Sequence, residues 1–207
     1  MSNHLAMSPA LPSSPKRKAA RVLTEVLAPA QLALLTLVYV SWRASESIAA
    51  GLGWGLLAAL FVVLVPYGVV LLGVRAQRWT DHHLRVRQQR FVPLCLGVVS
   101  AGLGLYLLHR LAAPSDLIAL VIASIAGLLI CLAVTVVWKM SVHAGVIAGA
   151  AVIVALTAGA ATLAITVPLI LAAAWSRVVL KDHTKAQVIT GAIVGALVAG
   201  LVFTAAR

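Results

Sequence analysis

Long apolar runs fill most of this chain and leave only short polar segments between them. Seven runs reach or approach membrane-spanning length, at about residues 27–42, 52–73, 92–110, 116–137, 144–160, 163–176 and 186–204. A helix needs about 20 mostly apolar residues to cross about 30 Å of hydrocarbon. Because an open sheet would leave backbone groups unsatisfied in lipid, such runs fold as helices. The sequence therefore predicts an all-α, polytopic transmembrane helical bundle of about six to seven spans.

The composition argues against a soluble domain and against a nucleic-acid partner. Residues of the hydrophobic set make up 62% of the 207 residues and charged residues 10%, whereas soluble domains are about 45–50% apolar and about a quarter charged. The formal net charge is +11, from 16 Lys and Arg against 5 Asp and Glu. A basic excess alone would fit nucleic acid or anionic lipid. Here the basic residues fall between the apolar runs, as membrane topology requires.

The N-terminal segment differs from the rest of the chain. Residues 1–25 are rich in Ser and Pro and then strongly basic, and the apolar run that follows opens a series of further spans. This order does not match a cleaved secretory signal. We therefore expect residues 1–25 to be a disordered basic cytoplasmic tail and residues 26–207 to form one transmembrane domain.

The positions of the charges predict the orientation. Three polar segments, at 75–91, 138–143 and 176–187, are each separated by two spans, so they return to the side that holds the tail. Only Arg43, Arg110 and Arg207 fall on the opposite side. The shared side carries thirteen of the sixteen Lys and Arg: Lys16, Arg17, Lys18, Arg21, Arg75, Arg78, Arg85, Arg87, Arg90, Lys139, Arg177, Lys181 and Lys185. By the positive-inside rule this side is cytoplasmic.

Two histidines stand out because each has hydroxyl and cationic neighbours at that side. His143 follows Lys139 and Ser141, and His183 comes six residues after Arg177. Ionisable groups that face a shared cavity at a membrane boundary tend to be functional. Since the cluster is cationic and nearly free of carboxylates, it would suit an anion, and Arg binds phosphate with two parallel hydrogen bonds.

Two imidazoles and several cations are sufficient for nucleophilic phosphoryl transfer. One His would attack phosphorus and the other would protonate the leaving oxygen, because an ordinary His pKa near 6.5 suits both tasks. No cofactor and no metal are expected, because the acidic residues needed for an oxygen-rich cage are few and scattered. They are Glu25, Glu46, Asp81, Asp116 and Asp182.

The spacing of these residues resembles the type 2 phosphatidic acid phosphatase superfamily, the integral-membrane lipid phosphatases. Ser176-Arg177, five residues and His183 resemble its third signature, SRxxxxxHxxxD, and Ser141-Val142-His143 resembles its second, PSGH. Arg87, Arg90 and Pro93 in RQQRFVP resemble its first, KxxxxxxRP. The resemblance covers roughly residues 50–204, and the three signatures occur in the same order as in the family. Among its members, the chain resembles divergent bacterial ones.

The resemblance implies a role for each of these positions. His183 would be the nucleophile, which forms a phosphohistidine, and His143 the general acid. Arg90 and Arg177 would clamp the phosphate. Arg87, Lys139 and Ser141 would add supporting phosphate contacts.

The sequence departs from the family pattern at several positions. Met140 and Val142 replace Pro and Gly of the second signature, His83 stands where the first has Lys, and Pro93 is displaced by two residues. Gln187 replaces the Asp that usually partners the nucleophile. On a helix Gln187 would lie one turn after His183 and would orient its ring through the amide oxygen, whereas Asp182 would point to another helix face.

Three functions remain open at this stage. The first is hydrolysis of a lipid phosphate or pyrophosphate, such as phosphatidate, phosphatidylglycerophosphate or a polyprenyl phosphate, in a bacterial plasma membrane. The second is a non-catalytic scaffold that binds lipid phosphates. The third is a small transporter, although no acidic residue lies near a span centre to couple an ion gradient. Dense Gly and Ala in the last three spans permit close packing within one chain or between copies, so a homo-oligomer is also left open.

Overall fold

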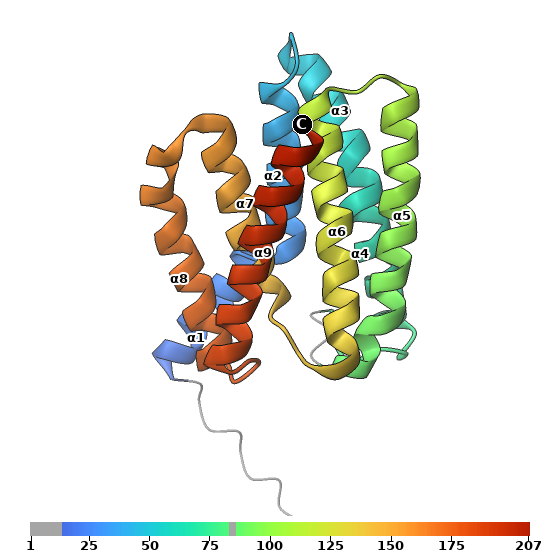
Figure 1. Ribbon diagram of the computed structural model, residues 1–207. Coiled ribbons are helices and arrows are strands. Elements are labelled where there is room, and N and C mark those ends of the chain that lie inside the picture. Colours follow the sequence, from blue (N-terminus) through green and yellow to red (C-terminus); the bar gives the residue numbers. More distant parts are fainter. Residues whose placement is uncertain (1–13, 83–85) are drawn as a thin grey trace, which may run out of the picture.

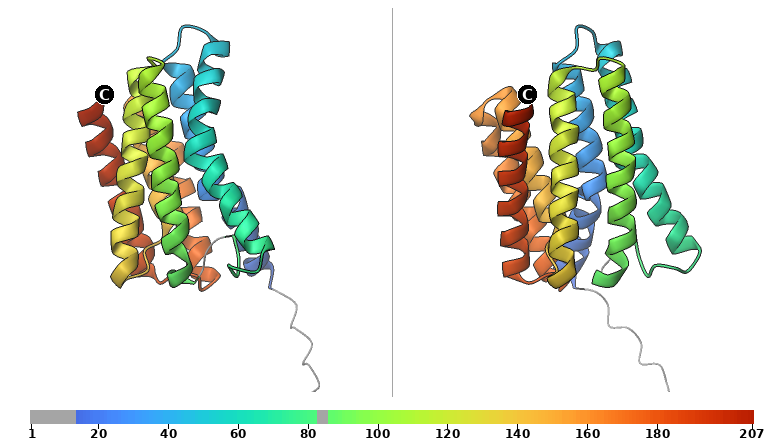
Figure 2. Two further views of the ribbon diagram at one scale, coloured as in Figure 1. Left: turned by 90° about the vertical axis from the view of Figure 1, so that its right-hand side faces the viewer. Right: turned by 45° about the vertical axis from the view of Figure 1, so that its right-hand side comes forward.

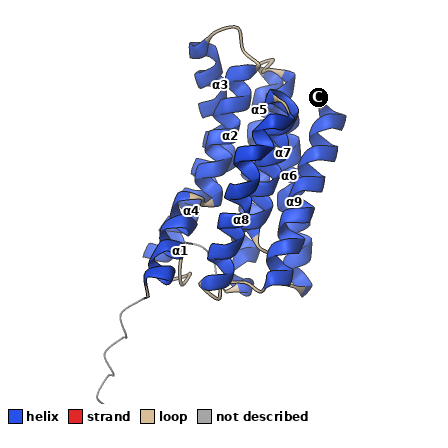
Figure 3. Ribbon diagram, turned by 90° about the vertical axis from the view of Figure 1, so that its left-hand side faces the viewer, coloured by secondary structure: helices blue, strands red, loops and turns tan. Residues whose placement is uncertain are grey.

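The structure, a computed structural model, describes residues 14–82 and 86–207. Within these residues all regular structure is helical and no strand occurs (Figure 3). The helices are α1 (Pro15–Val26), α2 (Pro29–Arg43), α3 (Ile48–Ala59), α4 (Val65–Arg75), α5 (Phe91–Arg110), α6 (Ser115–Val137), α7 (Val142–Ala158), α8 (Leu163–Val179) and α9 (Lys185–Ala206). Three short turns join them: η1 (Leu60–Leu64), η2 (Arg87–Arg90) and η3 (Ala160–Thr162).

Six helical segments are long and apolar enough to cross a membrane. They are Pro15–Arg43, Ile48–Arg75, Arg87–Arg110, Ser115–Val137, Ala160–Val179 and Lys185–Ala206. The apolar helix α7 is shorter, at 17 residues. The prediction of an all-α polytopic bundle is therefore confirmed, and the chain has the architecture of an integral membrane protein.

The polar segments gather at one end of the bundle (Figure 1). The start of α1, the end of α4, the start of α5, the α6–α7 link and the α8–α9 turn all lie at the lower end in this view. The α2–α3, α5–α6 and α7–α8 turns and the C-terminus lie at the other end, and the rotated views agree (Figure 2). The side shared by the polar segments was predicted from the number of intervening spans.

Helix α1 corrects the expectation of a disordered tail. Residues Pro15–Val26 are helical, and residues 1–13 lie outside the described part. Pro15 occupies a first-turn position, where its missing N–H is not needed. Ala20 and Thr24, one turn apart, are buried as α1 packs on α8. The Thr24 hydroxyl donates to Ser176 Oγ over 3.1 Å, so α1 is held directly beside the third signature.

A π-helical turn lets α3 continue into α4 despite a proline. Pro66 has no N–H and its ring crowds the preceding turn. The wider turn η1 at Leu60–Leu64 makes room for the ring. Ser100 on α5 donates its hydroxyl to the Phe61 carbonyl over 2.6 Å, which supplies a donor where the proline cannot. α5 is thereby fixed against the middle of this long helix.

Helices α7 and α9 approach at glycines. A Cβ on Gly195 would overlap the backbone of Gly145, and one on Gly191 would overlap the Ser141 carbonyl oxygen. Because only glycine avoids these overlaps, the small residues predicted to allow close packing do so here. The contact brings the starts of α7 and α9, which carry the two histidine segments, to the same place.

Candidate functional site

The α8–α9 turn sets the position of His183. Lys181 has a φ of 58°, in the left-handed region, and ends α8 as helix C-termini often do. The chain then folds back so that the Asp182 and His183 N–H groups both donate to the Arg177 carbonyl, over 3.1 and 3.3 Å. Asp182 Oδ2 lies 3.0 Å from Arg177 Nη2, and the Arg177 side chain is 1% exposed. The helix that was expected to turn Asp182 away from His183 does not run through Asp182, which lies in the turn and pairs with Arg177.

Gln187 is the partner of the His183 ring, as its spacing predicted. His183 Nδ1 lies 3.3 Å from Gln187 Oε1. The same oxygen accepts the Thr184 N–H over 3.1 Å, and Thr184 Oγ1 accepts the Gln187 N–H, which forms a capping box at the start of α9.

The capping box determines which His183 nitrogen is available. A backbone N–H can only donate, so the Gln187 atom facing it is the oxygen rather than the amide nitrogen. That oxygen can only accept, so a neutral His183 carries its proton on Nδ1. The lone pair is therefore on Nε2.

His143 lies in the first turn of α7 and is 5% exposed. Ser141 precedes it as the N-cap, and its Oγ accepts the Ala144 N–H over 3.4 Å. The Ser141 N–H donates to the Gln187 carbonyl over 3.1 Å, which joins the two histidine segments through the backbone. Val142 has a helical φ, since the only non-Gly residues with positive φ among those described are Gln77, Ala112 and Lys181. This turn therefore does not need the Gly found in the family signature.

Arg90 connects the first signature to the second. It ends η2 directly before α5, is 5% exposed, and its Nη1 donates to the Met140 carbonyl over 3.0 Å. Pro93 follows in the first turn of α5 and is buried. His83, where the family has Lys, lies outside the described residues.

One pocket, of about 220 Å³, is lined by Arg90, His143 and His183 together, and we call it the polar pocket after these residues, although most of its lining is apolar. Pro93 and Val142 line it as well. Arg90, His143 and His183 come from three segments about forty to fifty residues apart in the sequence. The segments that carry these three residues lie at the polar end of the bundle.

The other predicted phosphate ligands are not among the described residues that line this pocket. Arg87 Nη1 donates to the Thr135 and Val136 carbonyls over 3.2 and 2.8 Å, so it binds the C-terminal end of α6. Lys139 Nζ donates to the Asp182 carbonyl over 2.8 Å. Arg177 pairs with Asp182 and accepts the His183 N–H at its carbonyl, and Ser141 caps α7. These four residues support the walls of the pocket.

The surroundings of His183 favour its neutral form. Burial, and then the charges of Arg90, Lys139 and Arg177, lower the pKa of His183 from 6.5 to about 3, against the hydrogen bond to Gln187, which raises it. Burial, and then Arg90, also lower the pKa of Lys139. An anion in the pocket would offset this concentration of positive charge.

The pocket also contains residues that sequence reasoning did not select. Glu25 from α1 and His82 line its mouth, with Glu25 Oε2 3.6 Å from His82 Nε2. Tyr67 on α4 also lines it. Glu25 was not selected because residues 1–25 were expected to be disordered. The recurrence of Ala20, Leu23, Thr24 and Leu27 at helical spacing was the available signal.

No family model, no curated protein and no solved structure matches this chain.

Proposed function

We propose that this chain is a metal-independent lipid phosphatase of the bacterial plasma membrane, with its site at the cytoplasmic face. The observation that carries the proposal is that Arg90, His143 and His183 line one pocket at the polar end of a membrane bundle. The pocket combines a phosphate-binding guanidinium with two imidazoles. A lipid phosphate fits such a site because its charged group reaches the membrane boundary while its tail stays in the bilayer.

The first step would transfer the phosphoryl group to His183. The Nε2 lone pair attacks phosphorus, the bond from phosphorus to the lipid oxygen breaks, and His143, entering protonated, gives its proton to that oxygen. The products are a phosphohistidine and a lipid alcohol, or a lipid monophosphate when the substrate is a pyrophosphate. The low pKa of His183, about 3, keeps Nε2 unprotonated for this attack.

The second step would release phosphate. His143, now neutral, accepts a proton from water as the water oxygen attacks phosphorus, and the bond from phosphorus to nitrogen breaks. Arg90 would hold the phosphoryl oxygens, whose charge redistributes in both transition states. Arg177 would act from behind His183, through its charge.

A direct experiment compares phosphate release by wild type, His183→Ala and His143→Ala. The protein would be purified in detergent and supplied with phosphatidate, phosphatidylglycerophosphate and a polyprenyl phosphate. His109→Ala is the matched control, because His109 is exposed at the opposite end of the bundle. We expect release by wild type and the control only, together with an acid-labile phosphoryl group on wild type. Release that survives His183→Ala would contradict the mechanism.

One observation favours a second function, a lipid-phosphate-binding scaffold without turnover. The partner of His183 is an amide, so an imidazolium formed during the reaction would lack a carboxylate to stabilise it. A scaffold would bind a non-hydrolysable lipid phosphonate through Arg90 and release no phosphate from any substrate.

A further inference from the structure

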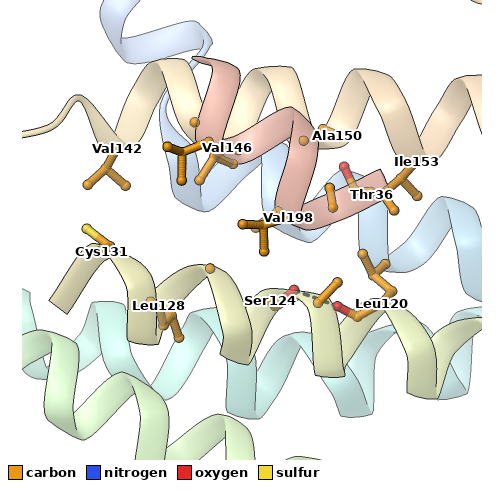
Figure 4. Close-up of a pocket in the computed structure, with 18 of the residues that line it drawn as sticks. Thr36, Leu120, Ser124, Leu128, Cys131, Val142, Val146, Ala150, Ile153 and Val198 are labelled. Carbon is orange, nitrogen blue, oxygen red and sulfur yellow. Dashed lines mark hydrogen bonds between the residues drawn. The ribbon is translucent and has the colours of Figure 1, made fainter. Parts of the chain in front are cut away.

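A second cavity lies deeper in the bundle and is almost entirely apolar. It has a volume of about 210 Å³ and lies between α2, α6, α7 and α9. Figure 4 shows Leu120 and Leu128 of α6 facing Val146 and Ile153 of α7 across it. Its two hydroxyls, on Thr36 and Ser124, donate to carbonyls of their own helices, at Leu32 and Leu120. The walls therefore present hydrocarbon to a ligand, because both hydroxyls already donate within their own helices.

This apolar cavity adjoins the polar pocket. Leu94, Leu128 and Val142 line both. Val142 directly precedes His143, so the near end of the apolar cavity lies beside the proposed phosphate position. A ligand that fills both spaces would have an anionic head and a hydrocarbon chain.

The length of the apolar cavity matches one leaflet of a bilayer. Its walls run from Val142 to Ile153 on α7 and, in the opposite direction, from Cys131 to Leu120 on α6. At 1.5 Å per residue each wall is about 16 Å long, against about 15 Å for half of the hydrocarbon core.

The far end of the apolar cavity is closed by the hydrophobic core. Leu37, Leu120 and Ile153 line the cavity and also belong to the main buried cluster. Beyond them Leu117 and Phe203 of the same cluster are fully buried. These buried side chains block the cavity at this end.

We propose that the apolar cavity binds an acyl chain of a lipid phosphate whose phosphate occupies the polar pocket. The inference rests on the proposed function and narrows its substrate to acyl lipids of ordinary chain length. A long polyprenyl chain would far exceed the closed end. Chain length, as well as the phosphate, then determines which lipids are processed.

Gly127 offers a way to fill the cavity without disturbing the fold. It lines the cavity on α6, and a Cβ there would meet no atom within 4 Å. Gly127→Leu should therefore place a side chain in the path of the acyl chain. Gly102→Leu is the matched control, because Gly102 lies within α5, lines neither cavity and has equally open space at its Cβ.

The test measures kcat/KM of both variants for long-chain phosphatidate and for a short-chain, water-soluble analogue. For Gly127→Leu we expect at least a tenfold loss with the long chain and less than a twofold change with the short one. Gly102→Leu should match wild type on both. The inference would be overturned if Gly127→Leu lowered kcat/KM by the same factor for both chain lengths. It would also be overturned if wild type preferred polyprenyl phosphate to phosphatidate.

A binding measurement separates this inference from the proposed function. Phosphatidate with a photoreactive group near the end of its acyl chain should label the residues around Leu120 and Ile153, at the closed end of the cavity. Excess unlabelled phosphatidate should prevent the labelling, and Gly127→Leu should reduce it. If wild type hydrolyses nothing but this labelling occurs, the proposed function fails and the acyl site stands. Labelling that excess phosphatidate does not prevent would contradict the acyl site.

Discussion

Nδ1 of His183 lies 3.3 Å from the side-chain oxygen of Gln187, and that oxygen also accepts the backbone N–H of Thr184. One amide group therefore begins α9 and orients the imidazole that we propose as the nucleophile. The family that the sequence resembles has a carboxylate at this position. Here an amide contacts the ring and carries no negative charge.

Replacing Gln187 by Glu should restore a charge with little change in shape. Glu is a standard third residue of a capping box, and a carboxylate near the ring would raise the pKa of His183 from about 3. We expect the acid limb of the pH profile of kcat/KM to move to higher pH. Gln187→Leu, which removes the acceptor, should lose activity at every pH. Identical profiles for wild type and Gln187→Glu would show that His183 does not control the reaction.

The low pKa of His183 also predicts how stability depends on pH. The folded pKa of about 3 lies below the ordinary 6.5, so between these values the unfolded chain binds more protons. The contribution of His183 is fully present above about pH 6.5 and is lost as the pH falls toward 3. In detergent, the Tm of wild type should fall on acidification more steeply than that of His183→Gln. His109→Gln is the control and should follow wild type.

The two arginines of the first signature should differ in their effects. Arg90 lines the polar pocket, whereas Arg87 binds the carbonyls at the end of α6. A hydrogen bond to a charged group contributes about 1.5–3 kcal/mol, so Arg90→Lys should lower the affinity for phosphate roughly ten- to a hundredfold. Arg87→Lys should leave phosphate affinity unchanged and lower Tm. Binding of a lipid phosphonate and thermal unfolding measure the two effects, and equal affinity losses would contradict this division.

The ion pair between Arg177 and Asp182 should be much more important for stability than the pair between Arg207 and Asp116. Asp182→Asn leaves the fully buried Arg177 without its carboxylate, which costs about 3–5 kcal/mol. Asp116→Asn breaks a contact of the same 3.0 Å length, but Arg207 is 46% exposed, and such pairs contribute about 0–1 kcal/mol. Denaturant unfolding of the two variants in detergent compares these costs. Similar losses of unfolding free energy in the two variants would show that the Arg177–Asp182 pair is not essential to the α8–α9 turn.

Much of the fold could be predicted because its causes are local. Apolar runs of spanning length fold as helices in a membrane, because helices satisfy their own backbone hydrogen bonds. Two such runs separate each polar segment from the next, so the polar segments lie at the same end of the bundle. The four-residue spacing also predicted the pairing of Gln187 with His183, although His183 lies just before α9 and the capping box, rather than a shared helix, brings the Gln187 side chain back to it. The glycines at 145, 191 and 195 indicated close packing, and a contact between α7 and α9 uses them.

The remaining features depend on tertiary contacts. Helix α1 is stabilised by its packing on α8, which its basic composition does not reveal. Asp182 turns toward Arg177 because Lys181 adopts a left-handed conformation, and Lys is not a residue that signals such a turn. Arg87 donates to the carbonyls at the C-terminal end of α6 and does not line the pocket. Of these features only α1 has a signal in the sequence, the helical spacing of Ala20, Leu23, Thr24 and Leu27.

The glycine contact between α7 and α9 has a mechanical consequence. Where the backbones of Gly145 and Gly195 meet, no side chain separates them, so no rotamer change can widen the gap at that point. His143, in the first turn of α7, and His183, two residues before α9, are thus held on helices that meet backbone to backbone. Any widening of the pocket to admit a lipid headgroup has to come from the opposite wall, where α1 supplies Glu25 and α4 supplies Tyr67.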